Sequence, residues 1–184
     1  MKTPFGAIII LLGSLSGAWA TSNQVGASAP APVLVTFDGQ YRYLSKLYYP
    51  GEDRPREPRS IVVLNFMSLK CGPCKKELPV LLETMRPLVK KGEETGQPIR
   101  FFLISTDPLS SKEDLKKFIV EQGVDPATEV LLDPYQMTAG KFGITNIPRT
   151  FVISAQGRIA GDIQGTDEFK KMLVKGVRAA LKDK

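Results

Sequence analysis

Both cysteines of the chain lie in one short segment, Cys71–Gly72–Pro73–Cys74. Two cysteines at this spacing can bind a metal, form a structural disulfide or exchange a disulfide with another molecule. Zinc requires four ligands, usually cysteine and histidine, and this chain has two cysteines and no histidine. A disulfide that closes so short a loop removes little entropy from the unfolded chain. The motif therefore favours redox chemistry, and we expect no metal.

The residues around the motif place it between a strand and a helix. A continuous apolar run, residues 60–67, has the length of a buried strand, and a helical pattern follows over residues 75–91. Cys71 would then lie at the start of a helix, where free N–H groups and the helix dipole favour the thiolate, which is the nucleophilic form. Cys74, one turn into the helix, would be more shielded and could attack Cys71 intramolecularly. We therefore predict that Cys71 is the nucleophile and that Cys74 resolves the intermediate.

The rest of the chain alternates between strand and helix patterns. Two β-prone runs around Asp38–Gly39 predict an N-terminal hairpin over residues 33–43. We expect Pro79 and Pro87 to kink or break the helix that follows the cysteines. The remaining predictions are strands at 99–106 and 129–133, helices at 110–123 and 135–144, a second hairpin at 149–165 and a final helix at 166–184. This order predicts an α/β fold with a mixed central β-sheet flanked by helices.

The N-terminus has the pattern of a secretory signal peptide. Lys2 precedes a short apolar run over residues 6–15, and Ala18–Trp19–Ala20 is a cleavage pattern. We therefore expect a signal peptide at 1–20, a flexible lead-in at 21–32 and one domain at 33–184. A retained N-terminal membrane anchor is the alternative. Export to the periplasm would place the cysteines where disulfides persist.

The composition indicates a folded domain. The chain is 42% hydrophobic and 24% charged, which excludes a disordered chain of low hydrophobicity. Its formal net charge of +6 is modest, and no long basic run with interleaved aromatic residues occurs. We therefore expect no nucleic-acid partner.

Four segments resemble a known family: FDGQYRYLSKL, VVLNFMSLKCGPCKKELP, LLDPYQMTAGKFGITNIPRTFVIS and AQGRI. The chain resembles the thioredoxin-fold, exported TlpA/ResA-like thiol–disulfide reductases over about residues 33–184. The resemblance implies a thioredoxin-like fold with an N-terminal β-hairpin extension. It implies reduction of disulfides in exported target proteins through Cys71 and Cys74, with no cofactor beyond this redox-active pair. It also implies a membrane thiol transporter as electron donor, within cytochrome c maturation.

The resemblance also assigns the surface that binds a target. Ile147–Pro148 matches the family's cis-proline, beside which the backbone of Ile147 would pair with an extended substrate segment. Gly72 and Pro73, between the cysteines, belong to the same surface. Lys70 occupies the position where these families usually carry tryptophan, so their substrate preference does not transfer directly.

Lys70, Lys75 and Lys76, here called the lysine rim, could make the surroundings of the cysteines positive, together with Arg149. Such a rim would lower the pKa of the Cys71 thiol and favour acidic partners. Ordinary solvated lysines are the alternative interpretation.

Glu77 lies where ResA-like proteins carry a partly buried glutamate near the cysteines. Such a carboxylate can exchange protons as Cys74 changes state. The alternative is a solvated glutamate in the first helical turn, which the helix dipole favours. Thioredoxins carry a buried aspartate on the preceding strand, but this chain has Asn65 there, which cannot titrate.

Three other functions remain open. A disulfide-forming oxidase would use the same cysteines in the opposite direction. A thiol peroxidase shares the fold, but its upstream proline and threonine correspond to Leu64 and Ser68. A peptide-binding or chaperone module would use the groove beside Pro148 without turnover.

Overall fold

The computed structural model describes residues 25–49, 58–125, 128–165 and 167–183 of the chain. The predicted signal peptide and the first part of the predicted lead-in lie outside the described residues. No helix within these four ranges is long and apolar enough to cross a membrane.

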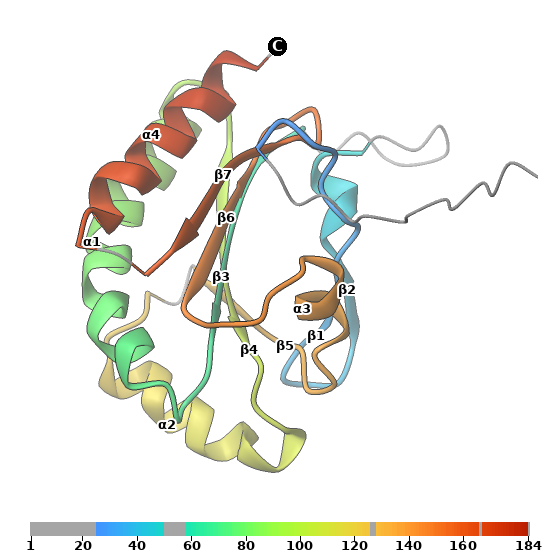
Figure 1. Cartoon of the computed structure of the whole chain (residues 1–184), viewed down its shortest axis with the longest axis vertical. Helices are drawn as coiled ribbons and strands as arrows, with labels where there is room; N and C mark the ends of the chain where they lie inside the picture. The colour runs from blue at the N-terminus through green and yellow to red at the C-terminus, as the bar shows by residue number, and fades with distance from the viewer. Residues whose placement is uncertain (1–24, 50–57, 126–127, 166, 184) are drawn as a thin grey trace, which may run out of the picture.

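Seven strands form one mixed sheet in the order β2-β1-β5-β4-β3-β6-β7 (Figure 1). The three central strands, β3, β4 and β5, run parallel, and their carboxyl ends therefore meet at one edge of the sheet. The two predicted hairpins add antiparallel strands on either side, so the predicted mixed sheet is confirmed. The bounds are β1 (Val33–Val35), β2 (Tyr41–Tyr43), β3 (Ile61–Met67), β4 (Ile99–Ser105), β5 (Glu129–Leu132), β6 (Arg149–Ile153) and β7 (Ile159–Gln164).

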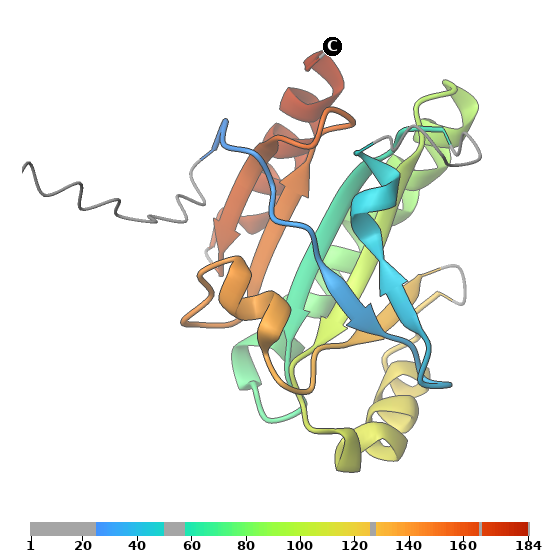
Figure 2. The same cartoon turned by 90° about the vertical axis from the view of Figure 1, so that its right-hand side faces the viewer.

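Helices cover both faces of this sheet (Figures 1 and 2). Strand β3 is buried along its whole length, and its alternate side chains belong to two separate cores. Ile61 and Val63 pack on the face under α1 (Gly72–Glu94), α2 (Lys112–Glu121) and α4 (Phe169–Lys182). Val62 and Leu64 pack on the face under α3 (Met137–Lys141) and the 3-10 helix η1 (Leu44–Leu47). Strand β3 thus contributes side chains to the core on each face of the sheet.

We predicted a kink or a break at Pro79 and Pro87; helix α1 is continuous, so the break does not occur. Both prolines lie on the exposed side of the helix, where water can hydrate the carbonyl groups that lose their N–H partner. The opposite side carries Leu78, Leu81 and Met85, which are buried against the sheet. Burial of this apolar side outweighs the two missing hydrogen bonds. The helix predicted over 110–123 is divided into η2 (Leu109–Ser111) and α2.

The segment before β1 differs from the flexible lead-in that we expected. The backbone N–H of Gly26 donates to the carbonyl of Ile159, and that of Ala29 donates to the carbonyl of Gly157, both at 2.7 Å. The hydroxyl of Tyr49 donates to the carbonyl of Ala29 at 3.0 Å. Backbone pairing and the tyrosine hydroxyl therefore hold residues 26–29 along the β6–β7 turn.

Candidate active site

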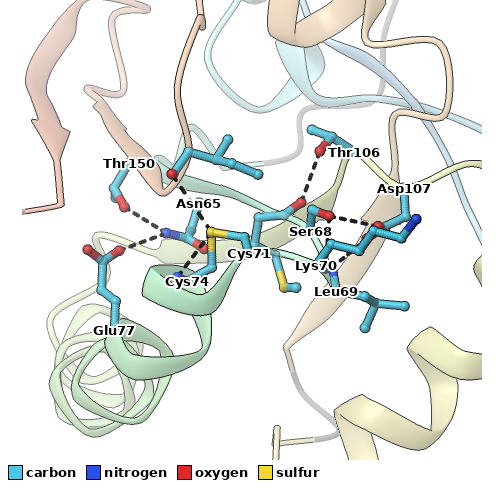
Figure 3. Close-up of a disulfide and its surroundings, with 12 residues drawn as sticks. Asn65, Ser68, Leu69, Lys70, Cys71, Cys74, Glu77, Thr106, Asp107 and Thr150 are labelled. Carbon is cyan, nitrogen blue, oxygen red and sulfur yellow. Dashed lines mark hydrogen bonds between the residues drawn. A yellow bond between two sulfur atoms is a disulfide. The ribbon is translucent and has the colours of Figure 1, made fainter.

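The two cysteines form a disulfide at the amino end of α1 (Figure 3). Cys71 is the N-cap residue, and the backbone N–H of Cys74 donates to its Sγ atom at 3.1 Å. Cys74 is 4% exposed, whereas Cys71 is only half-buried. An attacking thiol or a target disulfide can therefore reach Cys71 more readily than Cys74. This asymmetry matches the predicted roles of nucleophile and resolving thiol.

A tight turn between β3 and α1 positions Cys71. Its backbone N–H donates to the carbonyl of Ser68 at 3.0 Å. The hydroxyl of Ser68 and the N–H of Leu69 each donate to the carboxylate of Asp107 at 2.8 Å. We did not predict Asp107 from the sequence. The available signal was that Ser68 and Asp107 each follow a buried strand, and neighbouring parallel strands end at one edge.

The Ile147–Pro148 peptide bond is cis, as the resemblance implied. The carbonyl oxygen of Ile147 lies 3.7 Å from Sγ of Cys71. Pro148 is buried, whereas Ile147 is half-buried. The cis-proline loop and the cysteine pair are therefore in contact, although 76 residues separate Cys71 from Ile147. Gly72 and Pro73 are exposed beside them in the first turn of α1.

A groove of about 550 Å³ lies along the same side of α1. Pro73, Glu77 and Val80 line one wall, and Ile147, Pro148 and Gly165 line the other. A Cβ atom on Gly165 would lie 3.1 Å from Cγ of Pro148 and 3.4 Å from Oε2 of Glu77. Glycine at this position therefore keeps the groove open between Pro148 and Glu77.

Glu77 lies half-buried one helical turn after Cys74, and the two residues therefore share a face of α1. Asn65 Nδ2 donates to Oε1 of Glu77 at 3.3 Å and to the hydroxyl of Thr150 at 2.9 Å (Figure 3). Burial raises the pKa of Glu77 to about 7, although the hydrogen bond from Asn65 acts in the opposite direction. Near neutral pH this carboxyl group can both take up and release a proton. The half-buried position differs from the fully solvated alternative, and proton exchange between Glu77 and Cys74 stays a prediction.

The three lysines of the lysine rim are exposed around the site. Lys70 extends away from the disulfide (Figure 3), and Nζ of Lys75 lies 5.7 Å from the ring centroid of Phe118. Lys76 lines the groove. Our inclusion of Arg149 in this positive surface was wrong. Its guanidinium group is paired with Asp162 through two contacts of 2.6 and 2.7 Å, so its charge is largely neutralised.

The described residues contain no group of three or more His, Cys, Asp or Glu side chains that could hold a metal ion.

A disulfide at the start of a helix, on a mixed sheet and against a cis-proline, defines a thioredoxin-like thiol–disulfide oxidoreductase. The chain matches the AhpC/TSA family over residues 25–161, and it belongs to that family. The match begins within the predicted lead-in, where the backbone of residues 26–29 pairs with the β6–β7 turn.

Related proteins are named as thiol–disulfide oxidoreductases or interchange proteins. The thiol-disulfide oxidoreductase ResA of Bacillus thuringiensis (strain Al Hakam) is 28% identical over 142 residues, which cover 77% of this chain and 70% of that protein. ResA of Bacillus subtilis (strain 168) is 27% identical over 145 residues, which cover 79% and 70%. A thiol:disulfide interchange protein DsbE homolog of Paracoccus denitrificans (strain Pd 1222) is 28% identical over 138 residues, which cover 75% and 65%.

Solved structures with less sequence similarity share the fold. The thioredoxin domain of a thiol-disulfide oxidoreductase from Bacteroides vulgatus superposes with a TM-score of 0.63 at 22% identity, covering 83% of this chain and 96% of that chain. A thiol:disulfide interchange protein from Bacteroides sp. gives a TM-score of 0.61 at 22% identity, covering 84% and 91%. These likenesses support the predicted thioredoxin-like fold.

Proposed function

We propose that this protein reduces disulfides in exported target proteins. The observation that carries the proposal is the asymmetry of the cysteine pair, in which Cys71 is accessible and Cys74 is buried. The Cys71 thiolate attacks one sulfur of the target disulfide and releases the other as a thiolate, which takes up a proton. Cys74 then loses its proton and attacks Cys71, which releases the second target thiolate. Two electrons pass to the target, and the protein is left as the Cys71–Cys74 disulfide.

The pair needs no cofactor for this exchange, but it needs a reductant to start again. We propose a membrane thiol transporter as the donor and the periplasm as the compartment. The resemblance to exported reductases and the signal-peptide pattern at residues 1–20 support this assignment. In the compartment where disulfides persist, a reductase is oxidised by each target and must receive electrons from elsewhere.

The direction of electron flow is tested by the reduction potential of the Cys71–Cys74 pair. We expect a value of about −270 mV, typical of thioredoxin, when the protein is equilibrated with dithiothreitol or glutathione buffers. A value of about −120 mV would instead identify a strong oxidant and would favour the disulfide-forming alternative.

The contacts of Ser68 argue against the peroxidase alternative. The peroxidases that share this fold carry a threonine and a proline at the positions of Ser68 and Leu64. Here the hydroxyl of Ser68 donates to Asp107, and Leu64, at the position of the expected proline, is buried in the core. We therefore expect no peroxide consumption above that of a free thiol, which a direct peroxide assay checks.

We further propose that the lysine rim selects acidic segments of the target. Exchanging Lys70 and Lys76 for glutamate should slow reduction of an acidic disulfide peptide about three- to tenfold, because attraction becomes repulsion. The difference in rate between the variant and the parent should shrink at high salt, since exposed charges are screened within about 8 Å at physiological ionic strength. The measurement is the rate of peptide reduction as a function of ionic strength.

A matched control for this experiment lies further along α1, the helix that carries Lys76. Exchanging Lys90 and Lys91 for glutamate makes the same change in net charge about 20 Å further along α1. The control should reduce the acidic peptide at nearly the parent rate. Equal losses in both variants would show that net charge matters and that the position of the rim does not.

A further inference from the structure

Asp107 is a buried carboxylate that binds the turn leading to Cys71. The side chain is 7% exposed, and it follows β4 at the edge of the sheet where the cysteine motif also lies. Its Oδ1 atom accepts a hydrogen bond from the hydroxyl of Ser68, and its Oδ2 atom accepts one from the N–H of Leu69, both at 2.8 Å. A further bond comes from the hydroxyl of Ser105 at 2.7 Å. The group is therefore well supplied with donors, two of which belong to the turn.

Ser68 links this carboxylate to the backbone of the nucleophile. Its hydroxyl donates to Asp107 and also accepts the N–H of Lys70 at 3.2 Å. Its carbonyl accepts the N–H of Cys71 at 3.0 Å. Ser68 is thus hydrogen-bonded within the turn to both Lys70 and Cys71. Asp107 in turn connects Ser68 to the end of the neighbouring strand, β4. We call Asp107, Ser68 and Leu69 the turn clamp (Figure 3).

The clamp gains importance when the disulfide opens. In the oxidised protein the covalent bond itself holds Sγ of Cys71 close to Cys74, 3.1 Å from the N–H of Cys74. In the dithiol form that bond is absent, so the position of the Cys71 sulfur depends more strongly on the backbone of the turn that carries it. The N–H groups at the start of α1 stabilise a thiolate only while the sulfur remains close to them.

We propose that Asp107, acting through Ser68, is a positioning residue that keeps the Cys71 thiolate at the start of α1 in the reduced protein. The proposal rests on the proposed function only in taking Cys71 as the nucleophile. Asp107 does not need to touch the target or the sulfur. It acts by restricting the turn, and its effect should therefore appear in the reactivity of the Cys71 thiol more than in the stability of the fold.

Ser105 offers a matched control. Its hydroxyl donates to the same carboxylate as that of Ser68, but it lies on β4, and it accepts the backbone N–H of Asp107 at 3.1 Å. Ser68→Ala and Ser105→Ala thus each remove one hydroxyl donor from Asp107, and only the first removes a bond from the turn. Ser68→Thr keeps a hydroxyl at the turn and serves as the conservative variant.

The experiment measures the reaction of the reduced full-length protein with iodoacetamide between pH 5 and 9, together with the melting temperature of each variant. At pH 6 we expect Ser68→Ala to react at Cys71 about fivefold more slowly than the parent, the factor that corresponds to one lost hydrogen bond. The pH midpoint of alkylation should be higher in Ser68→Ala than in the parent. Ser68→Thr should recover most of the rate, and Ser105→Ala should stay within about twofold of the parent even if its melting temperature falls.

An unchanged rate and pH midpoint in Ser68→Ala would overturn the proposal. The hydrogen bonds of the turn clamp would then have a structural role only. Equal slowing in Ser105→Ala and Ser68→Ala would overturn it as well, because the turn would then not be the route of the effect. A parent protein whose faster thiol is Cys74 would instead contradict the proposed function itself. Peptide mapping of the alkylated cysteine separates these results.

Discussion

Replacing Cys71 by serine will abolish disulfide exchange, whereas replacing Cys74 by serine will trap the protein in a mixed disulfide with its target. A serine hydroxyl is not ionised at neutral pH and cannot attack a disulfide, so we expect Cys71→Ser to lose more than about 10³-fold in turnover. In Cys74→Ser the first attack proceeds at Cys71, but no thiol remains to release the target. The measurements are turnover with a disulfide peptide and mass spectrometry of the trapped species.

The double variant, Cys71→Ser with Cys74→Ser, is the control for this pair. It keeps the groove and the cis-proline while it removes all thiol chemistry. Biological activity that survived in the double variant would favour the peptide-binding or chaperone alternative. Trapping through Cys74 in Cys71→Ser would reverse the assignment of nucleophile and resolving thiol.

The second large effect is expected at Glu77. The resolving attack requires Cys74 to lose a proton, and the carboxylate of Glu77 is available to accept it above its pKa of about 7. In the parent, decay of the mixed disulfide should therefore accelerate as the pH rises through about 7. In Glu77→Gln this transition should vanish, and the step should slow by about 10²-fold, the lower range for general base catalysis.

Single-turnover kinetics isolates this step from the first attack by Cys71, which has its own pH dependence. The first attack should be nearly unaffected in Glu77→Gln, so the two phases serve as internal controls for each other. A Gln variant whose decay retained a midpoint near pH 7 would show that another group accepts the proton.

The same titration has a consequence for stability. Because burial raises the pKa of Glu77 in the folded protein, the folded state binds this proton more tightly than the unfolded state between about pH 4.5 and 7. The parent should therefore lose stability as the pH rises through this window. Glu77→Gln should remove that loss. The free energy of unfolding of the variant, relative to that of the parent, should therefore be higher at pH 8 than at pH 5. Denaturant unfolding at the two pH values measures the difference.

The order of elements and the chemistry of the cysteines followed from local patterns. The continuous apolar run over residues 60–67 predicted a buried strand, which is β3, and the motif at its end predicted the start of a helix. Helix α1 shows the limit of such local rules. Pro79 and Pro87 locally disfavour a continuous helix, but both face solvent while Leu78 and Leu81 anchor the same helix to the sheet.

The sequence by itself determined which atoms can react, because spacing along the chain decides that Cys71 and Cys74 meet and that Glu77 shares their face of α1. The tertiary structure decided what holds and surrounds them. Asp107 reaches Ser68 across 39 residues, and Asn65 reaches Thr150 across 85 residues. Such contacts depend on which strands pair and in which register, since the carboxylate and its donors meet only where β3 and β4 end together. That pairing arises from burial of the whole sheet, which no local pattern specifies.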